Sequence, residues 1–562
     1  MTLRRHGCRR ALLLAACLAA SLLGLAVRGA PARASLQQES TFQDDKLLVY
    51  GTPAQQAHAL DVIRSLGADR VRVSVFWSIV APGAAATARP HFDATDPGAY
   101  GATAWNRYDT LLELAAARGI AVNFNVTSPA PLWATGRPPR SDIAKNWEPS
   151  AAEFGEFITA LGRRYSGTYV PARAAPSVPA GKPLPRVSYW SIWNEPNQPG
   201  WLTPQYSGSA AHPVPVAPVI YRNLLDAAYA ALVATGHTPL GAGGNDTLLV
   251  GETAPKGEGL TRLRPCSAAH TAEICTAAIK PVDFIRTLYC VGASGQPLSG
   301  ATATAVGCPA TFSAAAFVRA HPALFNATGY AHHPYELTFA PTQVPKDPAF
   351  VTIANLPTLT ALLAQIMSDY AFKRPLGLPL YLTEFGYLTD PPSPLGLTFA
   401  EQSAFMNEAE FTTYNNPNVA TLSQFLLVDD LPKRGVRNPL IAYGGTFQTG
   451  LELANGRHKP SFEAYRVPID VPFPHTGRSH GVRVWGMVRA ARRFGSGRVA
   501  IQWLARGRGA HWHTLKVVVL PRGVRFLDVH VRPPASGELR LAWVPPGSRR
   551  AVYSRLVPIR VR

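Results

Sequence analysis

Short apolar runs alternate with amphipathic segments from about residue 46 to residue 466. Apolar runs dense in valine, isoleucine and leucine predict strands at 47–50, 70–77, 120–126, 187–193, 240–244, 330–333, 380–383 and 421–428. Apolar positions at helical spacing predict helices at 53–66, 104–118, 150–165, 219–235, 358–372 and 400–415, one that begins at 282, and a short one at 461–465. The pattern is therefore a strand followed by a helix, eight times.

Eight such alternations predict a closed parallel (β/α)8 barrel, also called a TIM barrel. The strands of such a barrel are buried on both faces, which explains why these runs are continuously apolar. An open doubly wound sheet is the alternative. The chain has no Gly-x-Gly-x-x-Gly turn after its first predicted strand, so a dinucleotide-binding fold has no support.

The pattern changes near residues 468–474, which divides the chain into domains. After this point six short valine-rich segments follow without helical periodicity: 482–488, 499–503, 515–520, 526–531, 539–543 and 552–561. Glycine and proline turns separate them, which is typical of a small antiparallel β-sandwich. We therefore predict a barrel over residues 35–470 and a C-terminal β-domain over residues 471–562.

The first 34 residues have the features of a signal peptide. Four arginines precede residue 11, an apolar stretch covers residues 11–27, and Ala32-Arg33-Ala34 has small residues where a signal peptidase cleaves. An uncleaved membrane anchor is the alternative. We predict cleavage after Ala34, a secreted protein, and no transmembrane segment after cleavage.

Four cysteines remain beyond this segment, all between residues 266 and 308. An even count in an exported chain favours disulfides. Three pairings are possible, and we prefer Cys266–Cys275 with Cys290–Cys308. A zinc site is the alternative, but the chain lacks the Cys-x-x-Cys spacing typical of one.

The formal net charge of +20 is unevenly distributed. Residues 35–470 contain 31 Lys and Arg against 33 Asp and Glu, whereas residues 471–562 contain 18 against two. A basic tail is suited to weak contact with anionic polymers. Its charges are spread out rather than clustered, which favours solvated strand edges and gives no support for specific nucleic-acid binding.

Two glutamates follow predicted strands directly. Glu195 lies in Trp193-Asn194-Glu195-Pro196-Asn197 after the fourth strand, and Glu384 lies in Thr383-Glu384-Phe385-Gly386 after the seventh. In a barrel, all strands end at the same face, so the two carboxylates are expected to meet there. A pair of carboxylates among aromatic residues indicates glycoside hydrolysis, which requires no cofactor and no metal.

These motifs resemble those of the clan A retaining glycoside hydrolases, which include families 5 and 39. The resemblance covers roughly residues 40–466 and implies that Glu195 is the acid/base and Glu384 the nucleophile. It also assigns Arg72 on the second strand and the His333-Pro334-Tyr335 pattern on the sixth to the site. The residues expected to bind substrate are Arg72, Asn194, His333, Tyr335, Trp133 and Trp193. The chain departs from the clan at two places. It has no tryptophan after the eighth strand and no histidine after the third.

The sequence therefore predicts an exported retaining hydrolase of β-linked oligo- or polysaccharides. One alternative is a catalytically silent carbohydrate-binding protein of the same fold. Another is a wall-attached structural protein with the basic C-terminal domain as its anchor. The same two carboxylates suit several pyranoses, so the motifs do not select the sugar.

Overall fold

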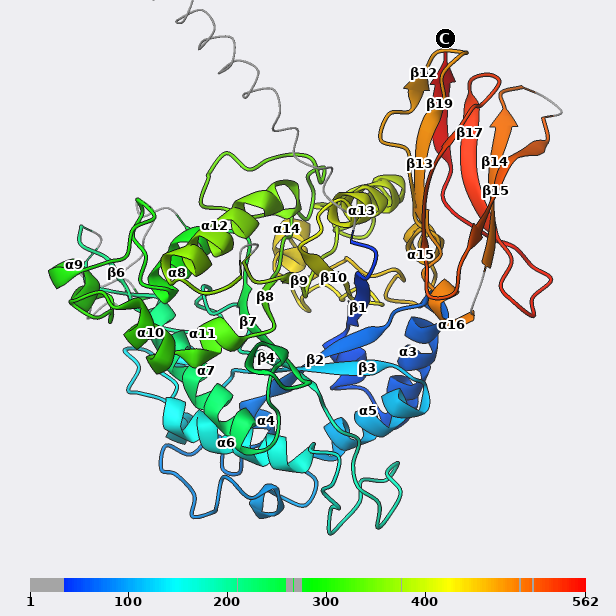
Figure 1. Cartoon of the computed structure of the whole chain (residues 1–562). Helices are drawn as coiled ribbons and strands as arrows, with labels where there is room; N and C mark the ends of the chain where they lie inside the picture. Colours follow the sequence, from blue (N-terminus) through cyan, green and yellow to red (C-terminus); the bar gives the residue numbers. More distant parts are fainter. Residues whose placement is uncertain are drawn as a thin grey trace, which may run out of the picture.

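A closed barrel of eight parallel strands forms the larger part of the molecule (Figure 1). The computed structural model describes residues 35–562 except 210, 259–265, 267–274, 375–376, 495–496 and 508–509, so the predicted signal peptide lies outside the described residues. The barrel strands in chain order are β1 (Glu39–Gln43), β2 (Arg70–Phe76), β3 (Ala121–Thr127), β4 (Tyr189–Ile192), β7 (Thr247–Thr253), β8 (Gly329–His332), β9 (Leu380–Leu382) and β10 (Val419–Phe425). The barrel closes where β1 pairs with β10.

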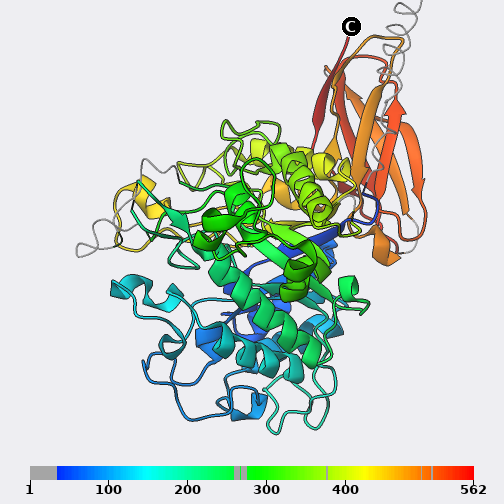
Figure 2. The same ribbon diagram turned by 60° about the vertical axis from the view of Figure 1, so that its left-hand side comes forward.

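Helices surround the barrel and cover its outer face (Figures 1 and 2). The longer ones are α3 (Pro53–Leu66), α5 (Asn106–Ala117), α6 (Ala151–Arg164), α7 (Ala217–Ala234), α8 (Pro281–Leu288), α12 (Leu356–Asp369), α13 (Phe399–Tyr414) and α15 (Pro460–Arg466). The shorter ones are α2 (Asp45–Leu48), α4 (Trp77–Val80), α9 (Gly300–Ala305), α10 (Ala314–Ala320), α11 (Pro322–Asn326), α14 (Pro439–Tyr443) and α16 (Ala491–Phe494). A short hairpin, β5 (Tyr206–Ser207) with β6 (Val214–Pro215), lies between β4 and α7. The (β/α)8 prediction is confirmed.

Local sequence explains why the helix bounds were predictable. α3 begins at a capping box in which Thr52 and Gln55 satisfy each other's backbone N–H groups, and it ends at Gly67 with a φ of 92°. α6 begins after Ser150, whose hydroxyl accepts from the N–H of Glu153. These signals lie within four residues of each boundary, so a sequence alone reveals them.

Two predicted strands were wrong. Residues 47 and 48 lie in α2, because Asp44 caps a helical turn there, residues 49–50 follow it as a turn, and the first barrel strand is the earlier β1. Residues 240–244 begin with a 3₁₀ turn, Leu240–Ala242, and the fifth barrel strand is β7. The region around this turn is rich in glycine, and Gly243 has a φ of 81°, so an extended strand is disfavoured.

The C-terminal region contains two sheets, as predicted for an all-β unit. A three-stranded sheet has the order β11 (Ile469–Asp470), β13 (Val482–Met487), β16 (Phe526–Val531). A six-stranded sheet has the order β12 (His475–Thr476), β19 (Val557–Val561), β17 (Gly537–Trp543), β14 (Gly497–Ala505), β15 (Trp512–Leu520), with β18 (Val552–Tyr553) beside β17. Side chains from both sheets, among them Val484 and Leu541, share one apolar core. The first sheet begins at Ile469, slightly before the predicted domain boundary.

The C-terminal sheets pack beside α3 and α13, near the start of β1 and β2 (Figures 1 and 2). Two buried arginines make this contact. Arg489 bonds Glu410 of α13 and Ser40 of β1, and Arg525 bonds Ser40 and Asp69. Ser40 and Asp69 lie at the N-terminal ends of barrel strands, so the C-terminal sheets cover the end opposite the strands' C-terminal ends.

The cysteines pair as preferred. Cys266–Cys275 and Cys290–Cys308 form disulfides with Cα–Cα distances of 5.1 and 5.8 Å. Within the described part of the chain, no helix combines the length and apolar character needed to cross a membrane.

Candidate active site

The two glutamates singled out in the sequence lie at the same end of the barrel. Glu195 is the third residue after β4, and Glu384 is the second after β9. One carboxylate oxygen of each lies within 4.8 Å of the other. Carboxyl groups about 5–5.5 Å apart are typical of retaining glycosidases, whereas inverting enzymes need about 6.5–9.5 Å. The separation therefore fits a shared sugar ring and the retaining geometry.

Arg72 of β2 connects these carboxylates to the barrel interior. Its guanidinium is fully buried and donates to Glu384 Oε1 at 2.7 Å and to Glu252 Oε2 at 3.0 Å. It also donates to Asn194 Oδ1 at 2.6 Å and to Gln43. A planar group with several donors holds such a set of oxygens in fixed geometry. Arg72 thus orients Glu384 and Asn194 together, as expected from its place on the second strand.

His333 bridges two carboxylates. Its Nδ1 lies 2.9 Å from Glu195 Oε1, and its Nε2 lies 2.8 Å from Glu252 Oε2. The ring is fully buried. The Tyr335 hydroxyl donates to Glu384 Oε2 at 3.1 Å. His333 and Tyr335 therefore each contact one of the two predicted catalytic carboxylates.

Charge coupling in this cluster shifts several pKa values. Burial would raise the pKa of Glu252, but Arg72 and His333 lower it to about 2. Burial would lower the pKa of His333, but the charge of Glu384 and the bonds to Glu195 and Glu252 raise it to about 10. At neutral pH, Glu252 is therefore a carboxylate and His333 an imidazolium.

Glu384 is in a more balanced environment. The pKa of Glu384 is raised, because burial outweighs the cations of His333 and Arg72, which act in the opposite direction. Glu384 receives hydrogen bonds from Arg72 and Tyr335, which favour its charged form.

The backbone is strained at two of the glutamates, Glu195 and Glu252, near the C-terminal ends of β4 and β7. Glu195 has a φ of 36° and Glu252 a φ of 49°. The pairing of β7 with β8 shifts register between Gly251 and Thr253, so Glu252 is an extra residue in a β-bulge. Gly251 has a φ of 103°, and a Cβ there would lie 2.5 Å from the Tyr330 ring. Bulges and positive φ at non-glycine residues are concentrated at functional sites, where they direct a side chain.

A pocket of about 490 Å³ opens above the two glutamates. This volume lies within the usual range for small-molecule sites. The residues that line it include Glu195, Glu384, Asn194 and Tyr335, together with Gln43, Asp45, Lys46, Ser74, Gln198, Trp201, Ala254, Pro255, Lys256, Leu337, Phe425, Leu426, Asp430 and Phe447. Both carboxylates, polar donors and several aromatic rings thus face one cavity.

Two tryptophans expected to stack on sugars do not line this pocket. Trp193 is fully buried, its ring packs against Phe154, and its indole N–H donates to the carbonyl of Trp201 at 3.0 Å. Trp133 packs edge-on against Trp77 and donates to the carbonyl of Pro82. The tryptophan that faces the pocket is Trp201, whose backbone Trp193 supports.

The predicted site residues omit several polar residues of the site, and three of these omissions follow from a misplaced strand. Gln43 is the last residue of the unpredicted β1, Asp45 follows it, and Glu252 lies on β7. The sequence contained a signal for Glu252. The run Leu248-Leu249-Val250-Gly251 is apolar and ends in a glutamate, as do the runs before Glu195 and Glu384.

Glu195, His333 and Glu384 each have one oxygen or nitrogen within 4.8 Å of the others. This spacing raises the question whether the three residues bind a metal ion. A histidine binds metal through the lone pair of a neutral ring. Both ring nitrogens of His333 face carboxylates, and its raised pKa keeps the ring charged. Arg72 adds a second cation, so the donor set is better suited to proton and glycosyl transfer.

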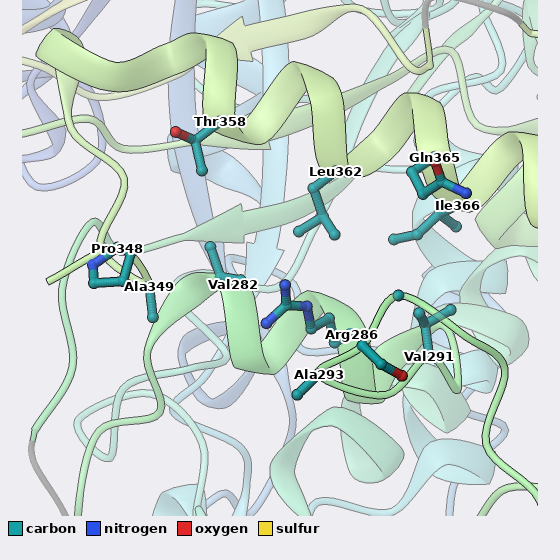
Figure 3. Close-up of a pocket in the computed structure, with 12 residues that line it drawn as sticks. Val282, Arg286, Val291, Ala293, Pro348, Ala349, Thr358, Leu362, Gln365 and Ile366 are labelled. Atoms are coloured by element: carbon teal, nitrogen blue, oxygen red, sulfur yellow. The ribbon is translucent and has the colours of Figure 1, made fainter.

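A second pocket, of about 480 Å³, lies between α8 and α12 on the outside of the barrel (Figure 3). Figure 3 shows Arg286 of α8 projecting toward Leu362 of α12, among mostly apolar side chains. The residues that line it include no carboxylate and no imidazole. Of these two pockets, the first is the one that both glutamates line.

No family model matches this chain, and no curated protein matches it. The fold resembles solved structures at low identity. A family 39 β-xylosidase from Caulobacter crescentus is 14% identical with a TM-score of 0.43, covering 90% of this chain and 98% of that one. A family 1 β-glucosidase from Thermotoga maritima is 13% identical with a TM-score of 0.40, covering 74% and 85%.

An FMN-binding β-glucuronidase from Facaelibacterium prausnitzii L2-6 is 10% identical with a TM-score of 0.39. The match covers 95% of this chain but only 57% of the glucuronidase. With TM-scores below 0.5, these likenesses do not identify the reaction of this chain.

Proposed function

We propose that this protein hydrolyses β-O-glycosides with retention of configuration, through a covalent glycosyl-enzyme intermediate. The observation that carries the proposal is the pair Glu195 and Glu384, with oxygens within 4.8 Å across one pocket. The different hydrogen-bond donors around the two carboxylates support different roles for them.

In the first step, a Glu384 oxygen attacks the anomeric carbon while the glycosidic C–O bond breaks. Glu195 gives its proton to the leaving oxygen, so the leaving group departs as an alcohol. In the second step, Glu195 takes a proton from water, and the water oxygen attacks the anomeric carbon. The ester bond to Glu384 breaks, and the sugar is released with its original configuration.

The surrounding residues are suited to bind the sugar. Asn194 accepts from Arg72 through Oδ1, which leaves its NH₂ group as a donor to a ring hydroxyl. Trp201 provides an aromatic face, and Asp45 and Asp430 provide carboxylates for further hydroxyls. The substrate class is an oligo- or polysaccharide outside the cell, which agrees with the predicted signal peptide and with the disulfides.

The proposal is tested on residues 35–562 with a panel of nitrophenyl β-glycosides and common polysaccharides. Turnover is expected, with the first-formed sugar in the β configuration by NMR. Glu384→Ala should lose at least about 10⁴-fold in kcat. Added azide should then restore product as the α-glycosyl azide, because the small anion attacks from the side that Glu384 occupied. Glu410→Gln, a buried carboxylate outside the pocket, is the matched control and should keep normal kcat.

Sugar binding without turnover by the unmutated protein would contradict the proposal and favour a carbohydrate-binding protein. Turnover that persists in Glu384→Ala without azide would remove the nucleophile assignment. Neither binding nor turnover on any glycoside would favour a structural role at the cell wall.

A further inference from the structure

We propose that Glu252 is a positioning residue for this reaction: its carboxylate orients His333 so that the Nδ1–H of the ring donates to Oε1 of Glu195. Oε2 of Glu195 is then the oxygen that exchanges a proton with the leaving group and with water. This inference rests on the proposed function. Glu252 does not line the pocket, so it acts through His333 rather than on the substrate.

The contacts of Glu252 reach both catalytic carboxylates. Its Oε2 accepts from His333 Nε2 at 2.8 Å, from Arg72 Nη2 at 3.0 Å and from Thr383 Oγ1 at 2.6 Å. Thr383 directly precedes Glu384 in the chain. The backbone carbonyl of Glu252 accepts from the N–H of Glu195 at 2.9 Å. One residue of β7 thus fixes the chain beside both glutamates.

The hydrogen bonds assign one proton of the ring. Both nitrogens of His333 lie within 2.9 Å of a carboxylate oxygen. A carboxylate buried beside Arg72 is ionised and can only accept, so Nε2 must carry a proton. The proposal places the second proton on Nδ1, from which it is donated to Glu195, so that the ring is an imidazolium.

The carboxylate of Glu252 balances the net charge of the buried cluster. Before the first step the cluster contains two cations, Arg72 and His333, and two anions, Glu252 and Glu384, when Glu195 carries the proton. After Glu384 becomes an ester, the anions are Glu252 and the deprotonated Glu195. The buried cluster is therefore neutral in both half-reactions, and the charged form of a buried group is stable only when it is compensated.

Without the charge at position 252, the cluster would carry one excess positive charge at both stages. That charge favours loss of a proton from Glu195 or from His333. Proton donation to the leaving group would weaken, whereas attack by Glu384 would be less affected. The bulge and the positive φ of Glu252 agree with a role of this kind, because bulges and strained backbone that direct a side chain are concentrated at functional sites.

The test compares Glu252→Gln with the unmutated protein, using aryl glycosides whose leaving groups need or do not need protonation. Glu252→Gln should lose about 10²-fold in kcat/KM on a poor leaving group such as an alkyl or unsubstituted phenyl glycoside. It should lose less than about 5-fold on the dinitrophenyl glycoside, which leaves without a proton. The alkaline limb of its pH–rate profile should move to lower pH by about one unit, a change that a general loss of stability does not produce.

Two further measurements complete the test. Glu252→Asp should recover part of the loss, because it restores the charge. Glu410→Gln, the control above, should show neither the leaving-group dependence nor the shifted pH limb. If Glu252→Gln does not fold, ¹⁵N-histidine NMR of the unmutated protein decides: His333, assigned by loss of its signals in His333→Gln, is expected to be doubly protonated at pH 7–8.

A neutral His333 ring at that pH would overturn the inference. So would a Glu252→Gln variant with the unmutated pH profile and equal losses on all leaving groups. These outcomes differ from failure of the proposed function, in which the unmutated protein itself turns over no glycoside.

Discussion

The barrel has a buried arginine cluster at each end, and the two clusters differ in what surrounds them. At the C-terminal ends of the strands, Arg72 contacts Glu252 and Glu384, and the cluster opens onto a pocket. At the N-terminal ends, Arg489 and Arg525 contact Glu410 and Asp69 beneath the C-terminal sheets.

The two ends have different charge balances. The cluster at the N-terminal ends of the strands has one acid for each arginine, Glu410 for Arg489 and Asp69 for Arg525. Each of these ion pairs is complete without a ligand. The cluster at the pocket has three glutamates against Arg72 and His333, so it is neutral only when it binds one further proton. A buried ion pair therefore supports structure when its charges are matched, and supports chemistry when a proton is shared and a substrate can reach it.

Among substitutions of the arginines at the two ends, Arg72→Met is expected to have the largest effect. Removal of the cation leaves Glu252 and Glu384 uncompensated, and both bind protons more readily. We expect kcat to fall by about 10³-fold and the free energy of unfolding to fall by about 3–5 kcal/mol, measured by steady-state kinetics and urea unfolding. Arg72→Lys keeps the charge but not the planar fork. Its kcat and its free energy of unfolding should therefore lie between those of Arg72→Met and the unmutated protein. Unchanged kcat in Arg72→Met would show that the cluster at the pocket is only structural.

Arg489→Met, at the N-terminal ends of the barrel strands, should lower the stability of the protein without lowering its activity. It leaves Glu410 buried without its cation, so the free energy of unfolding should fall by about 3–5 kcal/mol. The fraction that remains folded should keep its kcat/KM, because the substituted group lies at the far end of the barrel from the pocket. A parallel loss of kcat/KM in folded Arg489→Met would mean that the two ends are coupled.

The pH dependence of stability should show the charge of His333. Its pKa is raised from 6.5 to about 10, so its contribution is complete below pH 6.5 and is lost as pH rises toward 10. Glu252, with its pKa lowered from 4.5 to about 2, contributes above pH 4.5, and this is lost as pH falls toward 2.

Between pH 6.5 and 10, a single proton changes the free energy of unfolding by at most about 1.4 kcal/mol per pH unit. Urea unfolding of the unmutated protein should show this alkaline loss, and His333→Gln should lack it. Identical slopes for the two proteins would mean that the ring is neutral in the folded state.

The smallest effect is expected at an exposed pair on the C-terminal sheets. Arg483 donates to Asp528 at 2.8 Å, and both side chains are partly exposed to solvent. Asp528→Asn should change the free energy of unfolding by less than about 1 kcal/mol, and less still at high salt. A change as large as that for Arg489→Met would contradict the distinction between buried and exposed pairs.

Local sequence by itself determined most of the helices, six of the eight barrel strands and the two glutamates, whereas the structure decided among the three possible disulfide pairings. These features depend on residues close together in the chain: caps such as Thr52 and Ser150, or an apolar run that ends in a carboxylate. The same rule applied at 248–252 would have found Glu252, but the glycine-rich segment before it obscured the strand.

Only the tertiary structure decided which polar groups meet. Arg72 contacts Glu252 and Glu384, 180 and 312 positions away in the chain, and no local pattern encodes such a distance. It also decided that Trp193 is buried while Trp201 faces the pocket, although both tryptophans follow the same strand. Barrel closure brings the ends of all eight strands together, so the charge balance of the site is a property of the closed barrel and not of any one segment.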